Sequence, residues 1–249
     1  MGTSKIQKII LFFGFVLGPL SFCLPSWVSS ETEIYQKLNS ELSKKNGDYL
    51  KRTVRRLGKK TIELEGFAAI NGTLEVFSKV AGDLKGYRNW ALTGINQKPT
   101  GGMYLLKILD LRQSPTIHNQ IIAKFGLSFP GIQHTFERAF TINNFRTTQS
   151  TTVTCENTAG HHSLLSSLNG FITAFPAPQQ SERLWVYFKG RAQITSWLLY
   201  EALPEKLLST ESSERIQTVL DNYGNEEVRK LTSGPKLNRI KTPQKKRKR

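Results

Sequence analysis

The chain has 249 residues, of which 38% are hydrophobic, 10% aromatic and 22% charged, with a formal net charge of +16. This composition supports a buried core, and the length fits one good-sized domain or two small ones. Two cysteines exclude a disulfide-stapled scaffold, and no Cys/His cluster has the spacing of a zinc site. We therefore expect no metal and no cofactor, and a domain that is held together by burial.

The first thirty residues have the layout of a secretory signal. Lys5 and Lys8 precede the apolar run Ile9–Phe22, and small residues allow a cut after Ser30. The run has about 14 residues where a membrane span needs roughly 20, so a retained anchor is the weaker interpretation. Cys23 stands in a sequence that is similar to a lipoprotein box, which leaves a lipid-anchored form open. The sequence thus predicts residues 1–30 as a signal peptide and an exported chain, periplasmic or secreted.

The positive charge is concentrated at the C-terminus. Nine basic residues and no acid lie between Lys230 and Arg249, which leaves 24 basic and 19 acidic residues, or +5, for Glu31–Arg229. Residues 231–249 have too few apolar side chains to fold and are predicted to form a disordered polybasic tail. Contact with anionic membrane, with another polyanion, or simple solubility are the open roles of its last five residues: Lys245, Lys246, Arg247, Lys248 and Arg249.

Residues 31–60 are predicted to form a basic helical segment. Ile34, Leu38 and Leu42 recur every four residues, and similar spacing continues after Asn46 and Gly47. The opposite face carries basic residues that include Arg52, Arg55 and Arg56. This face is either a solvated surface or a contact for anionic lipid headgroups.

From Thr61 the apolar period changes to two, which predicts a first strand over Thr61–Asn71. Thr73 is the expected cap of a helix over Leu74–Leu84. A long C-terminal helix, Trp197–Val228, is expected to break at Pro204. Between the helices, turn residues separate further predicted strands near Ala91–Gln97, Met103–Leu111, Ile121–Phe129, His134–Ile142, Arg146–Cys155, Leu164–Phe175 and Arg183–Gly190.

This order of elements resembles the START-like superfamily, also called SRPBCC or helix-grip proteins. Three segments carry the likeness: Thr61–Asn71 as the first strand, Gly72–Trp90 with Asp83, Tyr87 and Trp90 in its aromatic turn, and Trp197–Leu208 as the start of the closing helix. The resemblance covers residues 61–230. It implies an α+β fold in which a curved antiparallel sheet of about seven strands wraps a long C-terminal helix, with an extra N-terminal helix.

The same resemblance implies a cavity between sheet and helix that binds an apolar ligand such as a lipid. Its expected walls are aromatic and apolar side chains, with Arg138 as a possible partner of an acidic headgroup; core filling is the alternative role of each. These candidates are Trp90, Phe125, Phe136, Arg138, Phe140, Phe171, Trp185, Trp197 and Leu198.

Motifs of several enzyme classes are absent. The sequence has no Gly-x-Ser-x-Gly elbow, no His-Glu-x-x-His pair and no phosphate-binding glycine loop. We therefore predict an exported, non-enzymatic carrier of an apolar ligand that also touches an anionic membrane surface. A cyclase- or hydrolase-type enzyme using the same cavity is one alternative, and a polyanion-binding protein acting through the tail is another; nucleic acid is not the favoured partner.

Overall fold

The computed structural model describes residues 28–45, 47, 49–58, 60–96, 106–129, 132–159, 165–195 and 205–224. The elements within them follow in this order: α2 (Glu31–Leu42), β1 (Tyr49–Leu57), β2 (Thr61–Asn71), α3 (Leu74–Gly82), α4 (Tyr87–Trp90), β3 (Leu106–Gln113), β4 (Gln120–Phe129), β5 (Ile132–Arg146), β6 (Thr151–Ala159), β7 (Leu165–Ala177), β8 (Gln180–Ile194) and α6 (Glu205–Gly224).

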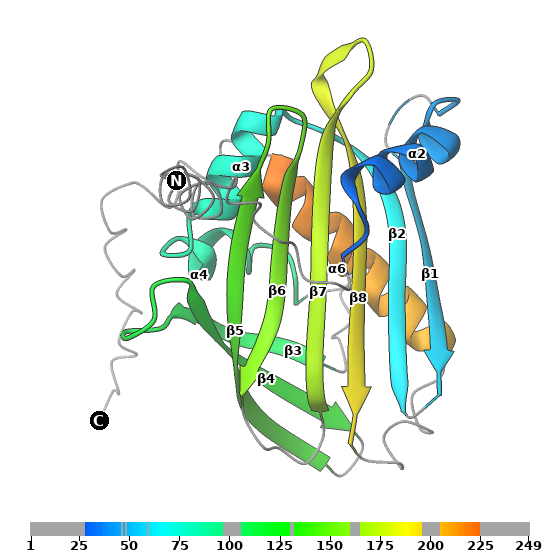
Figure 1. Cartoon of the computed structure of the whole chain (residues 1–249). Coiled ribbons are helices and arrows are strands. Elements are labelled where there is room, and N and C mark those ends of the chain that lie inside the picture. The colour runs from blue at the N-terminus through cyan, green and yellow to red at the C-terminus, as the bar shows by residue number, and fades with distance from the viewer. Residues whose placement is uncertain are drawn as a thin grey trace, which may run out of the picture.

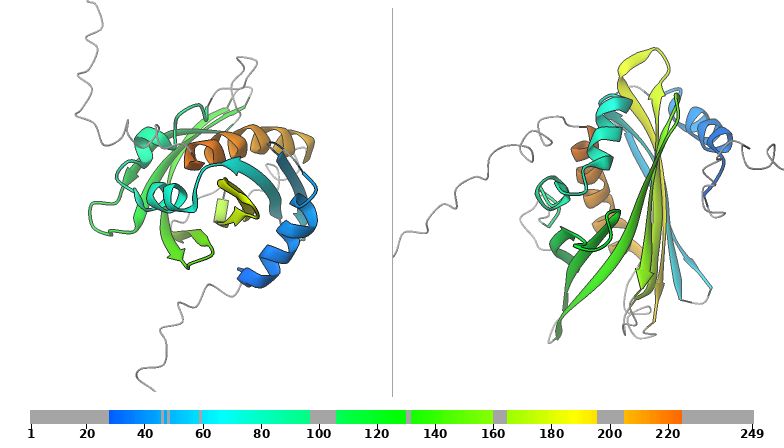
Figure 2. Two further views of the ribbon diagram at one scale, coloured as in Figure 1. Left: turned by 90° about the horizontal axis from the view of Figure 1, so that it is seen from above. Right: turned by 60° about the vertical axis from the view of Figure 1, so that its left-hand side comes forward.

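All eight strands belong to one antiparallel sheet in the order β1-β2-β8-β7-β6-β5-β4-β3. The sheet is curved, and α6 crosses its concave side (Figure 1). A view from above shows α6 and α2 on opposite sides of the strands (Figure 2). The predicted fold class is confirmed, with eight strands in place of about seven.

The helix predicted over residues 31–60 is half wrong. The chain is helical over Glu31–Leu42, but Gly47 turns it with a φ of 82° and Tyr49–Leu57 continues as strand β1, paired with β2. Leu50 and Val54 are four residues apart, and this spacing puts two side chains on one face of a strand as well as of a helix. The hydrogen bonds that β2 offers decide between the two.

Two further predictions are corrected at α4 and β3. Residues 91–96 form turns where a strand was expected, and β3 begins at Leu106 and ends at Gln113. The side chain of Asn96 accepts a hydrogen bond from the main-chain N–H of Ile108 at 3.0 Å and donates one to its carbonyl. A single amide thus takes the place that a neighbouring strand would occupy at this point.

Helix starts follow local chemistry. The Oγ1 atom of Thr73 accepts a hydrogen bond from the N–H of Val76 at 3.2 Å, as predicted for the cap of α3. Ser30 caps α2 in the same way, from the N–H of Glu33 at 3.3 Å. The closing helix α6 begins directly after Pro204, and it continues without a break through Ser213.

Each face of the sheet has its own apolar core. The larger core fills the concave side, between the sheet and helices α3, α4 and α6. On the convex side, Ile34, Leu38 and Leu42 of α2 pack against a second cluster that includes Phe175 and Tyr187. The three apolar residues predicted to share one face of this helix therefore form its buried face. The sheet is covered on both sides where α2 lies.

Candidate ligand cavity

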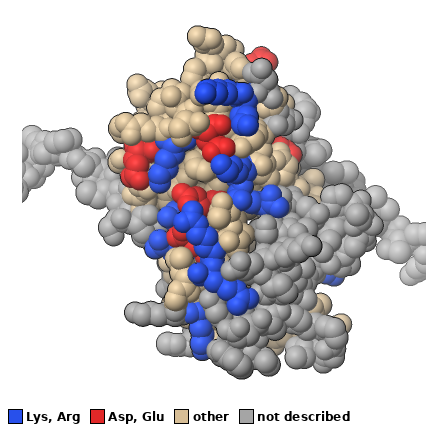
Figure 3. Space-filling model, turned by 90° about the vertical axis from the view of Figure 1, so that its right-hand side faces the viewer, with Lys and Arg blue, Asp and Glu red and all other residues tan. Residues whose placement is uncertain are grey.

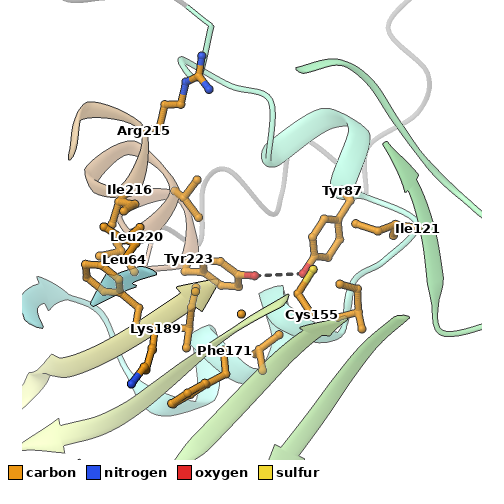
Figure 4. Close-up of a pocket in the computed structure, with 17 residues that line it drawn as sticks. Leu64, Tyr87, Ile121, Cys155, Phe171, Lys189, Arg215, Ile216, Leu220 and Tyr223 are labelled. Carbon is orange, nitrogen blue, oxygen red and sulfur yellow. Dashed lines mark hydrogen bonds between the residues drawn. The ribbon is translucent and has the colours of Figure 1, made fainter. Parts of the chain in front are cut away.

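A cavity of about 320 Å³ lies on the concave side of the sheet, beneath α6. Its volume is at the lower end of the range for pockets that take a drug-sized ligand. Most of the lining is apolar and comes from α6 and six strands: Leu64, Ile121, Ile142, Val153, Ile172, Phe188, Ile216, Val219 and Leu220. Figure 4 shows these side chains around the space.

Two glycines account for the space under the helix. Gly170 of β7 and Gly190 of β8 are register partners, and both line the cavity. A Cβ atom on Gly190 would meet nothing closer than 3.6 Å, the distance to the main-chain oxygen of Asn169. Other positions on this face of the sheet carry side chains that point toward α6, but these two glycines carry none. The space between the sheet and the helix is therefore not filled at this point.

The neutral polar groups of the lining lie together. The hydroxyl oxygens of Tyr87, from α4, and Tyr223, from α6, are 3.0 Å apart (Figure 4). Burial raises the pKa of Tyr87 well above its ordinary value and that of Tyr223 to about 12. Burial also raises the pKa of Cys155 to about 12. All three groups therefore keep their protons at neutral pH.

The charged groups of the two cationic residues in the lining bind partners outside the cavity. Lys189 pairs with Glu63 on the convex side of the sheet, with 3.4 Å between Nζ and Oε2. Arg215 donates from Nη2 to the main-chain oxygen of Leu106 in β3. The cavity is therefore an apolar space with a neutral polar point formed by two tyrosines.

Four of the predicted wall residues belong to the concave core beside the cavity. Trp90, Phe125, Phe136 and Phe140 are buried in it, and the rings of Phe125 and Phe136 stack with centroids 5.2 Å apart. Arg138 shares their strand face and is 4% exposed, with its pKa lowered by burial. The predicted alternation of β4 and β5 is correct, but these side chains fill the core rather than line the cavity.

The remaining predicted positions lie elsewhere. Phe171 touches the cavity, but its ring packs on Tyr187 in the convex cluster, at 5.7 Å between centroids. Trp185 lies in that same cluster, on the face away from the cavity, because neighbours along a strand point to opposite faces. Trp197, Leu198 and the tail residues 245–249 lie outside the described residues.

The predicted basic face of residues 51–60 is divided between the two sides of β1. Arg55 is on the convex side and pairs with Glu65 at 3.2 Å, whereas the strand alternation places Arg52 and Arg56 on the other side. Figure 3 shows basic and acidic side chains mixed on this surface. Lys51 likewise pairs with Glu41 at 2.7 Å. The convex surface is an ion-pair network, so the single cationic stripe expected of a helix is not formed.

The sequence indicates Tyr87 only as part of an aromatic turn, and Tyr223 only as an apolar position of the closing helix. Neither Gly170 nor Gly190 is assigned a role from the sequence, although a glycine inside a strand pattern suggests a bulge or a close approach of another main chain. Among the described residues, no helix is long and apolar enough to cross a membrane. The same residues contain no group of three or more potential metal ligands.

Comparison with solved structures finds proteins of similar architecture. A STAR-related lipid transfer protein from Xanthomonas axonopodis matches with a TM-score of 0.48 at 15% identity, over 74% of this chain and 96% of that one. Human STARD10 matches with a TM-score of 0.43 at 10% identity, over 88% of this chain and 85% of that one. The aromatase/cyclase Zhui from a Streptomyces species matches with a TM-score of 0.40 at 10% identity, over 74% and 96%.

The chain has an α+β fold in which one curved antiparallel sheet packs against a C-terminal helix. The predicted resemblance is confirmed at this level by the chain's own topology, in which a curved antiparallel sheet grips a C-terminal helix. No protein-family model matches the sequence, and no curated protein matches it either.

Proposed function

We propose that the protein is an exported, non-enzymatic carrier that binds a small apolar molecule, a lipid, in the cavity beneath α6. The observation that carries the proposal is the apolar space of about 320 Å³ between the sheet and α6. Burial of an apolar ligand there is favourable by roughly 25 cal/mol for each Å² removed from water. The volume favours a single-chain or compact molecule over a two-chain phospholipid.

The protonation of the cavity supports binding over catalysis. Tyr87, Tyr223 and Cys155 all have raised pKa values, so none of them is a base or a thiolate nucleophile near neutral pH. Arg138 is buried in the neighbouring core, and Glu137 is exposed and pairs with Arg112 at 3.0 Å. These contacts favour the carrier over the cyclase- or hydrolase-type alternative.

The direct test is to purify the protein from its native compartment and extract it for lipid mass spectrometry. We expect one class of apolar molecule at a fixed ratio to protein, and displacement of a neutral fluorescent lipid probe by the extract. A protein that yields no such molecule and binds no apolar probe would overturn the carrier proposal. Fractionation of the cells tests the exported location separately.

Contact of the tail with an anionic surface is a further part of this proposal. Nine basic residues between Lys230 and Arg249 support it. Removal of residues 231–249 should abolish retention on heparin or on anionic vesicles, because it removes the basic residues that would make the contact. Retention is measured at moderate salt, since ions screen weak charge contacts. Unchanged retention would assign the contact to another part of the chain.

A further inference from the structure

The hydroxyls of Tyr87 and Tyr223 leave one proton donor unused in the cavity. The two groups carry two protons between them, and the hydrogen bond that joins them at 3.0 Å uses one. Among the described residues, neither hydroxyl has another hydrogen-bond partner. Tyr87 is 6% exposed and Tyr223 is 4% exposed, so bulk water does not readily accept a hydrogen bond from the second hydroxyl proton. A buried donor without an acceptor is costly, and a ligand atom can relieve that cost.

The position of the pair is fixed by packing. The ring of Trp90 lies against both tyrosines, with centroids 4.7 Å from Tyr87 and 5.0 Å from Tyr223. Phe77 stacks on Tyr223 at 4.9 Å. The Tyr87 ring comes from α4 and the Tyr223 ring from α6, so the pair forms only when the closing helix is in place. The two hydroxyls are therefore held in position before any ligand enters.

The surroundings select a neutral acceptor. The charged ends of Lys189 and Arg215 are engaged outside the cavity, with Glu63 and with the main chain of Leu106. A carboxylate placed beside the tyrosines would lose its hydration without gaining a cation, which is strongly unfavourable. A ketone, ester or alcohol oxygen can accept a hydrogen bond from the unused hydroxyl proton at a much smaller desolvation cost.

We propose that the Tyr87–Tyr223 pair anchors the ligand by donating a hydrogen bond to one neutral oxygen, so that the cavity selects single-chain or compact lipids with a carbonyl or hydroxyl group over alkanes and over fatty anions. This rests on the proposed function, because it needs a ligand in the cavity. It adds the polar group by which the ligand is recognised and the place at which that group lies.

Three probes of matched length test it: methyl decyl ketone, dodecane and dodecanoate, each measured by displacement of a neutral fluorescent lipid probe. The wild-type protein should bind the ketone about tenfold more tightly than the alkane, as one neutral hydrogen bond allows. The double variant Tyr87→Phe with Tyr223→Phe should lose this preference and bind the ketone no more tightly than the alkane, because the buried carbonyl oxygen then has no donor. Both tyrosines are changed because either hydroxyl can donate once the other is gone. Tyr49→Phe, whose hydroxyl bonds to Glu41 on the convex side, is the matched control and should keep the preference.

The infrared carbonyl stretch of the bound ketone gives an independent measurement. It should lie at lower frequency in the wild-type and Tyr49→Phe proteins than in the double variant. Equal affinity for ketone and alkane in the wild-type protein, or tighter binding of dodecanoate, would overturn the anchor while the carrier function stands. Failure of all three probes to bind would instead overturn the proposed function. Unfolding curves of each variant confirm that the fold is retained.

Discussion

At the scale of single residues, Glu63 shows how the charged convex surface stabilises the sheet. Its carboxylate lies 2.7 Å from Nε of Arg191 and 3.4 Å from Nζ of Lys189, and the residue is 5% exposed. Burial by itself raises the pKa of this group, but the two cations together outweigh it and the pKa is lowered from 4.5. Glu63 of β2 thereby joins β8 through its side chain as well as through the backbone.

This contact makes the stability of the protein depend on pH. Because the pKa is lower in the folded than in the unfolded state, the contribution of Glu63 is complete above about pH 4.5 and is lost as the pH falls through the folded value. We expect the unfolding free energy of the wild-type protein to fall more steeply below pH 4.5 than that of Glu63→Gln. Urea unfolding across this range measures it, with Glu137→Gln on the exposed surface as control; equal slopes for wild type and Glu63→Gln would contradict it.

At the scale of elements, α2 is part of the folded unit. Its three buried side chains cover the convex cluster, and Glu31 at its start accepts a hydrogen bond from Ser150 after β5 at 2.6 Å. Ser30, the last residue of the predicted signal, caps this helix. A cut after Ser30 would remove that cap, which contributes about 1 kcal/mol in comparable helices.

Leu38→Ala tests whether the convex cluster and the cavity, which lie on opposite faces of the sheet, are energetically independent. Leu38 is fully buried in the convex cluster, so the truncation should lower the unfolding free energy by about 2–5 kcal/mol. Ligand affinity should not change, because the cavity lies on the opposite face. Chemical denaturation together with probe binding measures both effects. Leu109→Ala is the control, at a position 46% exposed, and should change neither. A loss of ligand affinity in folded Leu38→Ala would show that the two faces are coupled.

At the scale of the whole molecule, the cavity exists because the sheet and α6 are held apart at one place. The C-terminal end of α6 is fixed closely to the turn after β2, where a Cβ atom on Gly224 would overlap the main-chain oxygen of Asn71. Its inner face packs on the core through Leu220 and Tyr223. Between these contacts and the sheet, Gly170 and Gly190 leave the gap that the ligand is proposed to fill.

Gly190→Val tests that arrangement. The new side chain should project into the cavity from β8, lower probe affinity at least tenfold, and leave the unfolding free energy unchanged or raised by about 0.5–1 kcal/mol, since glycine weakens a strand. Binding assays and denaturation on the same samples measure both quantities. Gly58→Val, in a turn where a Cβ atom would meet nothing within 4 Å, is the control. Full probe affinity in a folded Gly190→Val protein would place the binding site elsewhere.

Local patterns in the sequence determined the strand faces of β4 and β5, the buried face of α2, the cap of α3 and the general order of elements. Each depends on neighbours along the chain and on the fixed periods of helix and strand. The same periods could not separate helix from strand at Tyr49–Leu57, because a spacing of four satisfies both. The bonding edge of β2 decided that segment.

Tertiary structure alone decided which aromatic side chains reach the cavity. Phe125 and Trp185 look alike in the sequence, yet one packs in the concave core and the other in the convex cluster. Tyr87 and Tyr223 are 136 residues apart, and only the closing of α6 over the sheet brings their hydroxyls together. Such a site depends on the register of distant strands and on the docking of one helix. Neither can be predicted from a local sequence pattern, because both depend on contacts between residues far apart in the chain.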